Sequence, residues 1–285
     1  MSLAKIAMQR FPRLSRIVGG WVQGWNRTGW QMAFYAKTIG ETRLAIRQYK
    51  NEIVRLVAGM SMGTGALAVI GGTVVIIGFL TFTTGAVIAV QGYKQLSGVG
   101  VEALTGFASA YLNVRIIAPV VAGIGLSATI GAGATAQLGA MRISEEIDAL
   151  EVMAIRSIAY LASTRVIAGV AVVIPLYCIA VICAFFAARF GTTSVYGQST
   201  GVYDHYFHTF LNPTDLIWSF VTVLVVGIAV MLVHTFYGFT ATGGPAGVGE
   251  AVGRAVRTSL IVLAFVVLGI SLAVYGQSGN FHLSG

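Results

Sequence analysis

Charged residues are scarce in this chain, and acidic residues are the scarcest of all. Of its 285 residues 10% are charged, with ten Asp or Glu against eighteen Lys or Arg. Hydrophobic residues make up 56% of the chain, and the mean hydropathy is +0.81. This composition excludes an ordinary soluble domain.

Chemical motifs are also lacking. The two cysteines, Cys178 and Cys183, are five apart on one predicted helix, so they point away from each other and do not form a disulfide. His205 and His208 have no third ligand at a set spacing, and we expect no metal site. The glycine-rich stretch 243–251 lacks the lysine of a phosphate-binding loop, and no nucleophile stands beside a base. We therefore expect no enzyme activity and no nucleotide hydrolysis by this chain itself.

Long uncharged stretches dominate instead. A membrane-spanning helix needs about 20 apolar residues. Five stretches meet this length: 56–93, 116–141, 166–188, 216–249 and 258–285. The sequence thus predicts an all-α polytopic membrane protein with five transmembrane helices. Their expected positions are about 64–92, 104–136, 158–188, 214–238 and 256–277.

The basic residues predict the orientation. Ten of the eighteen Lys and Arg lie in the first 55 residues, which the positive-inside rule places in the cytoplasm. The 137–157 and 239–257 loops are then also inside, whereas the 93–103 and 189–213 loops and the C-terminus are outside. Anchoring to an anionic inner leaflet explains the net charge of +8 better than nucleic-acid binding does. We expect a multi-pass protein of the plasma (inner) membrane that binds no nucleic acid.

Residues 1–52 have a different character from the rest. They contain no compact apolar core of a signal peptide. Apolar and aromatic residues recur at helical spacing, with cations on one face further on, which predicts one or two amphipathic helices at the cytoplasmic membrane interface. The residues concerned are Trp21, Trp25, Thr28, Met32, Tyr35, Ile39, Arg43, Arg47 and Lys50. A helical arm that packs on a partner is the alternative. Residues 53–285 then form the membrane domain that holds the five spans.

Small and polar residues inside the spans allow two interpretations. Glycines let transmembrane helices approach closely, although contact with a substrate is also open. The glycines concerned are Gly59, Gly63, Gly71, Gly72, Gly123, Gly125, Gly131 and Gly133. Those of the first two spans also offer a seam for a second subunit, and Pro119 predicts a bend in the second span. His234 is either functional or a neutral side chain bonded to a neighbouring helix.

The stretch MRISEEIDALEVMAI, residues 141–155, holds four of the ten acidic residues. Its apolar residues Ile143, Ile147, Leu150 and Ala154 form one stripe on a helix, which Ser144 is expected to cap. An acidic helix is repelled by an anionic membrane surface, so its polar face favours a protein partner. An apolar stripe with charged flanks is typical of helices that dock in grooves. A solvated loop helix without a partner is the alternative.

The run AQLGAMRISEEIDALEVMAI resembles the signature of the MlaE/YrbE permeases, membrane subunits of ABC transporters that act with MCE proteins on lipids. VRIIAPVVAG and GVGEAVGRAVRTSLIVL extend the resemblance over residues 50–277. It implies that 143–154 is a coupling helix, seated in a cytoplasmic ATPase that binds the ATP and Mg²⁺. We hypothesise that its acidic residues pair with basic residues of the ATPase, while Ile147 and Leu150 fill the groove. The expected coupling residues are Arg142, Glu145, Glu146, Ile147, Asp148, Leu150 and Glu151.

The resemblance further implies a path for a fatty acid or related lipid between two permease subunits, leading to MCE proteins outside. We expect this path to involve Arg115, Ile116, Pro119, Thr129 and Gln137. Ile116 and Gln137 replace carboxylates that are common in the family, and Thr129 replaces an arginine. Because a heterodimer keeps these charges in its other subunit, we favour a paralogous partner, as in the actinobacterial YrbE branch.

Two other functions remain open. A secondary transporter usually needs carboxylates within the membrane, whereas Glu102 and Asp215 lie near the ends of predicted spans. A structural scaffold for a larger complex is the second alternative.

Overall fold

The computed structural model describes residues 28–62 and 68–276, and every regular element in those ranges is a helix. Five helical segments are long and apolar enough to cross a membrane, which confirms the all-α, five-span prediction. They are Gly72–Ser97, Glu102–Ile143, Ile158–Val195, Pro213–Phe239 and Gly244–Tyr275.

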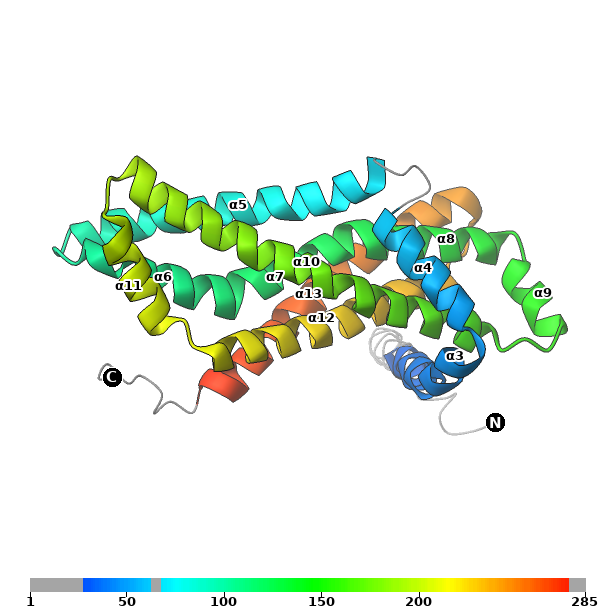
Figure 1. Cartoon of the computed structure of the whole chain (residues 1–285). Helices are drawn as coiled ribbons and strands as arrows, with labels where there is room; N and C mark the ends of the chain where they lie inside the picture. The colour runs from blue at the N-terminus through cyan, green and yellow to red at the C-terminus, as the bar shows by residue number, and fades with distance from the viewer. Residues whose placement is uncertain (1–27, 63–67, 277–285) are drawn as a thin grey trace, which may run out of the picture.

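The five spans lie side by side along one long bundle (Figure 1). The first is α5 (Ala68–Ser97), the fourth α12 (Pro213–Phe239) and the fifth α13 (Gly244–Tyr275). The third consists of η4 (Ile158–Ser163), α10 (Thr164–Phe190) and η5 (Gly191–Val195). The second consists of η1 (Glu102–Leu104), α6 (Thr105–Leu112), η2 (Asn113–Ile117), α7 (Ala118–Gly125), η3 (Leu126–Gly131) and α8 (Ala132–Ile143). Helix α10 packs on α5 and α12, and α13 packs on α12 and α8.

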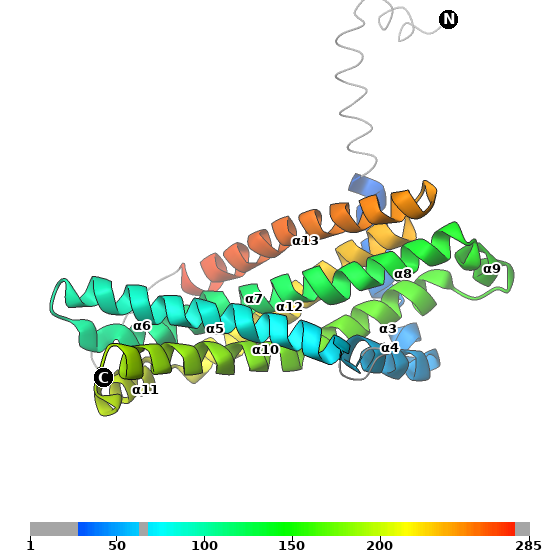
Figure 2. The same cartoon turned by 90° about the horizontal axis from the view of Figure 1, so that it is seen from above.

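The two ends of the bundle carry different elements. Residues 28–40, α3 (Thr42–Gln48), α4 (Lys50–Met62) and α9 (Glu146–Val152) lie at one end. At the other end lie α11 (Thr200–Phe210) and the C-terminal end of α13 (Figures 1 and 2). Five crossings therefore separate the N-terminal helices from the end of α13, and the charge distribution predicts that the α9 end is cytoplasmic.

The second span is continuous, although Pro119 lies inside it. The five residues of η2, just before Pro119, form a π-helical turn, and η3 forms another. A wider turn accommodates a residue that cannot donate a backbone hydrogen bond, so the helix goes on past the proline. At about 1.5 Å per residue, the span's 42 residues exceed the roughly 30 Å of hydrocarbon by a factor of about two. Part of this span must therefore project beyond the membrane.

The prediction that residues 239–257 form a loop is wrong. Helix α12 ends at Phe239 and α13 begins at Gly244, so only four residues connect them. Gly243 has a φ of 90°, which favours glycine and permits the tight turn. The charged residues that suggested a loop are helical, and Arg254 pairs with Glu250 one turn earlier at 3.3 Å. The fifth span is thus longer than the expected 256–277.

The first uncharged stretch, 56–93, belongs to two helices rather than one. Its beginning lies in α4 and the remainder of its described part in α5. The expected domain boundary between residues 52 and 53 falls inside α4, which packs on α10. The N-terminal helices are thus joined to the bundle of spans without a break at this boundary.

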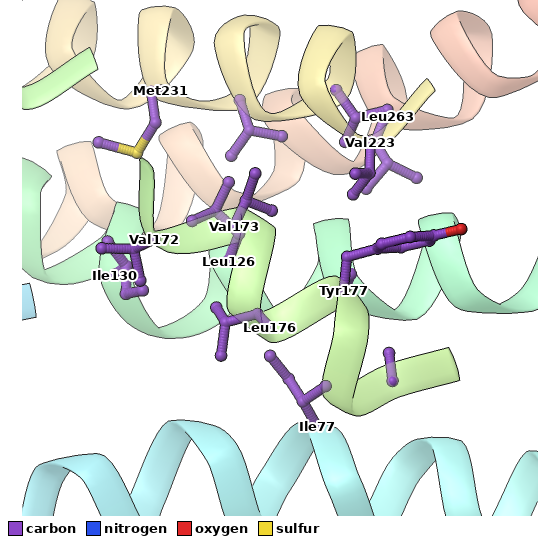
Figure 3. Close-up of a cluster of buried hydrophobic side chains, with 14 of the residues drawn as sticks. Ile77, Leu126, Ile130, Val172, Val173, Leu176, Tyr177, Val223, Met231 and Leu263 are labelled. Atoms are coloured by element: carbon purple, nitrogen blue, oxygen red, sulfur yellow. The ribbon is translucent and has the colours of Figure 1, made fainter. Parts of the chain in front are cut away.

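Apolar side chains from all the spans form the core (Figure 3). Ile77, Leu126 and Met231, from α5, η3 and α12, are fully buried in it. Several glycines allow this packing: a Cβ on Gly125 would lie 2.3 Å from the side chain of Ile77. Gly123 and Gly131 are similarly close to Leu263 and His234. Close packing is therefore the role of these glycines, and they do not supply a free seam for a second subunit.

Three other glycines face open space. Beyond its own turn of helix, a Cβ added at Gly59, Gly72 or Gly133 would meet no atom of the described residues within 4 Å. These positions are free for contact with lipid, substrate or a partner. Gly63 lies outside the described residues.

The helix over residues 28–40 is attached to the bundle. Phe34 is buried with its ring 5.5 Å from those of Phe236 and Phe239 at the end of α12. Ser163 of η4 donates a hydrogen bond of 2.7 Å to the carbonyl of Thr38. Met32 and other apolar side chains stay exposed, as the interfacial prediction requires. Trp21 and Trp25 lie outside the described residues.

Candidate functional site

Helix α9 protrudes from the end of the bundle between the second and third spans (Figures 1 and 2). Residues in the left-handed conformation bracket it: Glu145 with φ 62° before it and Ala154 with φ 59° after it. Few non-glycine residues adopt this conformation, because the Cβ crowds the backbone. The two reversals turn the chain out of α8, through α9 and back toward η4. The structure thus places the expected coupling residues on one compact projection.

The middle of the predicted apolar stripe faces its own chain, whereas its end residues Ile143 and Ala154 lie outside α9 and are exposed. Ile147 is fully buried against Leu138 of α8 and Leu161 of η4, and Leu150 is partly buried beside them. The hypothesis that Ile147 fills the groove of a partner is therefore wrong, and little of Leu150 is free to do so. Burying this stripe removes apolar area from water, and it fixes α9 on both neighbouring spans.

The acidic residues of this segment face outward. Asp148 accepts a hydrogen bond of 2.6 Å from Arg142, an exposed pair that contributes little to stability. Glu151 accepts one of 2.6 Å from Ser157. Ser144 does not cap the helix, because its hydroxyl bonds Glu146 and the backbone of α8 while Glu145 occupies the N-cap position. The segment presents a negative surface that is only partly neutralised within the chain.

Two exposed apolar residues complete this surface, and the sequence analysis did not single them out. Val152 is 89% exposed and Met153 is 61% exposed, at the C-terminal end of α9. The signal was present in the sequence, since both interrupt the polar face of the predicted helix. We define Glu145, Glu146, Asp148, Glu151, Val152 and Met153 as the α9 surface.

Thr129 and Gln137, from the expected lipid path, line one cavity of about 470 Å³. With Gly133 they occur at i, i+4 and i+8, on one face of η3 and α8. Two of the three positions at which the resemblance predicted a missing charge, Thr129 and Gln137, are thus walls of the same space. Ile116 and Pro119 do not line this cavity: Ile116 is exposed, whereas Pro119 is buried in the bundle.

Arg115 also lies apart from this cavity. Its Nε and Nη2 donate hydrogen bonds of 3.0 and 2.8 Å to one oxygen of Asp215, at the start of α12. Its guanidinium lies 4.0 Å from the ring centre of Tyr111 and 4.1 Å from that of Tyr275. The side chain therefore clamps the second, fourth and fifth spans together. Because Asp215 neutralises its charge, Arg115 offers no net charge to an anionic substrate.

We expect Asp215→Asn to lower the melting temperature of the detergent-purified protein. The side chains of Arg115 and Asp215 are only 16% and 13% exposed, so the arginine would lose its counter-ion in a poorly solvated place. Removing one member of a buried ion pair lowers the free energy of unfolding by about 3–5 kcal/mol. Because this pair is partly exposed, we expect a loss at the low end of that range. Asp204→Asn is the matched control, because its pair with Arg189 is exposed. Equal effects of the two changes would contradict the clamp.

Arg165 is a charged residue of the cavity wall, and the sequence analysis missed it. It lies within the predicted span 158–188, is 5% exposed, and lines the cavity with Thr129 and Gln137. A lone cation inside a span was the available signal, because such residues are costly in a membrane and commonly functional.

His234 belongs to a buried polar cluster between helices. Its Nδ1 is 2.7 Å from the hydroxyl of Thr135, and its Nε2 is 3.2 and 3.1 Å from those of Ser127 and Ser259. The two serine hydroxyls are 2.6 Å apart. Of the two interpretations of His234, these contacts favour a structural link among the second, fourth and fifth spans.

The other histidines lie on α11, at the opposite end from α9. His205 and His208 are exposed, and among the described residues no cluster of three His, Cys, Asp or Glu could hold a metal ion. Burial raises the pKa of Tyr203, on the inner face of α11, to about 12. Hydrogen bonds from Arg189 lower the pKa of Asp204. The burial of Tyr203 and the pair between Arg189 and Asp204 fix α11 on the bundle rather than form a reactive site.

Comparison with known proteins adds a family to this geometry. Residues 62–273 match the family described as Permease MlaE. A probable ABC transporter permease of Rickettsia felis is 28% identical over 243 residues, which are 84% of this chain and 92% of that one. The chloroplast protein TRIGALACTOSYLDIACYLGLYCEROL 1 of Arabidopsis thaliana is 30% identical over 179 residues, or 62% and 51% of the two chains. The intermembrane phospholipid transport system permease protein MlaE of Haemophilus influenzae is 27% identical over 186 residues, or 63% and 69%.

Proposed function

Because the chain belongs to the MlaE permease family, we propose that it is the membrane subunit of an ATP-driven lipid transporter. In this proposal it is a non-catalytic, multi-pass protein of the plasma (inner) membrane. A separate cytoplasmic ATPase binds ATP and Mg²⁺, and this chain holds no cofactor of its own. The name of the Haemophilus relative supports a phospholipid as the substrate. A fatty acid or related lipid fits the same apolar bundle.

The α9 surface is the observation that carries the proposal. It projects from one end of the bundle and combines acidic side chains with the exposed Val152 and Met153. Its inner face is fixed on Leu138 and Leu161, which belong to the second and third spans. A force applied to α9 is therefore transmitted to both spans. These spans supply walls of the cavity that Thr129, Gln137 and Arg165 line, so ATPase movement and cavity shape are coupled.

Two further kinds of partner belong to the proposal. The missing charges at Thr129 and Gln137 support pairing with a paralogous permease, and MCE proteins on the outer side would receive or deliver the lipid. The glycines at 123 and 125 pack within this chain, so the pair must form through another face. Exposed apolar residues of α5 and α13, such as Phe79 and Phe265, offer such a face.

Affinity purification of the full chain from its native membrane, followed by native mass spectrometry, tests the assembly. We expect an ATPase, a paralogous permease in a one-to-one ratio with this chain, and MCE proteins. Two copies of this chain without a paralogue, in an active complex, would rule out the asymmetric pair. Purification with no ATPase at all would contradict the ATP-driven transporter and favour a secondary transporter or a scaffold.

A further inference from the structure

Arg165 is a buried cation, and no carboxylate of the described residues binds it. Its Nη1 donates a hydrogen bond of 3.0 Å to the carbonyl of Leu161, and its Nη2 lies 3.9 Å from the sulfur of Met141. Its Nε is buried and has no hydrogen-bond partner among the described residues. A guanidinium carries five N–H donors, and a thioether sulfur is a weak acceptor. Most of the hydrogen-bonding capacity of this charge is therefore unused.

The nearby carboxylate is already occupied. Glu52 is close enough to act electrostatically on Arg165, but both of its oxygens accept hydrogen bonds from Arg55, at 2.8 and 2.7 Å. Arg55 lines the same cavity. Two cations and one anion leave one net positive charge at this place. In surroundings of low dielectric, such a charge favours an anionic ligand.

The cavity that receives this charge is largely apolar elsewhere. Leu56, Met60 and Ile130 line it, with the polar Thr129 and Gln137 beside them. Gly59 and Gly133 face into open space and leave room for a ligand. A small free anion would leave the apolar walls without contacts. An anionic group attached to an apolar chain satisfies both parts of the lining.

We propose that this cavity binds the anionic headgroup of a lipid, a phosphate or a carboxylate, with Arg165 as its main charged partner. The Gln137 amide and the Arg55 guanidinium are further donors at the same cavity. The inference rests on the proposed lipid transport and adds a headgroup site at the α9 end of the bundle. Because Gln137 and Arg165 lie on the helices that flank α9, headgroup binding would be coupled to the position of α9.

Lipid binding to the purified complex tests this site. The full-length chain with its accompanying subunits is incubated with equal amounts of phosphatidylglycerol and phosphatidylcholine, and bound lipid is counted by native mass spectrometry. We expect a preference for phosphatidylglycerol that Arg165→Gln lowers about tenfold, as the loss of a charge-assisted hydrogen bond predicts. Arg257→Gln, the same change at an exposed arginine, should leave the preference intact.

A second variant keeps the test decisive if Arg165→Gln does not fold. Gly133→Leu fills the cavity without changing any charge, and it replaces a poor helix former by a good one. It should reduce phosphatidylglycerol binding to the same extent. Retention of the preference by the folded variants would overturn the proposal. So would displacement of the lipid by glycerol phosphate at equal concentration, since the site would then bind free anions. Neither of these two overturning results depends on whether an ATPase co-purifies. Co-purification of the ATPase is the separate test of the proposed transporter.

Discussion

Replacing Val152 and Met153 together by aspartate is expected to detach the ATPase and abolish lipid-stimulated ATP hydrolysis, while the membrane domain stays folded. Both side chains are exposed, so their replacement removes no contact from the core. Burial of such a side chain at an interface contributes about 1.5 kcal/mol or more, so losing two weakens binding roughly 100-fold. The added carboxylates also place like charges beside the acidic residues of α9.

Co-purification of the ATPase and the melting temperature of the membrane subunit measure this result. Val99→Asp is the control, because Val99 is also exposed but lies in the turn after α5, at the opposite end from α9. Ile147→Asp should differ from the double variant, since it buries a carboxylate against Leu138 and Leu161 and destabilises the subunit as well. An ATPase that stays bound and active with the double variant would show that the α9 surface is not the coupling contact.

Replacing Gly85 by leucine is expected to prevent assembly of the bundle. A Cβ at Gly85 would lie 2.4 Å from the carbonyl oxygen and 3.1 Å from the Cα of Ala184, so α5 and α10 would have to move apart. Backbone atoms cannot rotate away as a side-chain tip can, and overpacking of a core already costs about 1–3 kcal/mol for single methylene groups. A whole leucine side chain between two backbones should lower the free energy of unfolding by more than the stability of the folded protein.

The yield of monodisperse protein in mild detergent measures this effect. Gly72→Leu is the matched control, because it makes the same change on the same helix at a position with no atom within 4 Å. We expect the control to give a normal yield with a slightly raised melting temperature, as a better helix former replaces glycine. Normal yield from Gly85→Leu would mean that the close approach of α5 and α10 is not required for folding.

The sequence determined the class of the protein and the place of its projecting helix. Spanning helices are a local property, because about 20 apolar residues in succession have few structures open to them in a membrane. The periodicity of 143–154 likewise predicted an amphipathic helix, and the structure has α9 within that range, shorter at both ends, over Glu146–Val152. The EExDAL element also led to the permease family that the comparisons establish.

Tertiary structure decided which way these elements face. The stripe of Ile147 and Leu150 marked an apolar side of a helix, but the neighbours that cover it, Leu138 and Leu161, come from two other helices. The sequence analysis also predicted a loop where α13 begins, because this segment carries charged residues. Local polarity cannot show that a helix extends beyond the membrane. Whether apolar area faces its own core or a partner depends on contacts between distant segments, which periodicity does not contain.

Only the fold brought the residues of the cavity together. Arg55, Thr129 and Arg165 come from α4, η3 and α10, and no spacing along the chain relates them. The same holds for Arg115 and Asp215, one hundred residues apart, whose pairing turned an expected substrate residue into a clamp. A charge in a span can be recognised in sequence, but its role depends on whether the packed helices supply a counter-ion. The packed helices supply a counter-ion for Arg115, whereas Arg165 faces a cavity. Electrostatic energy depends on distance and burial, so order in the chain does not reveal this difference.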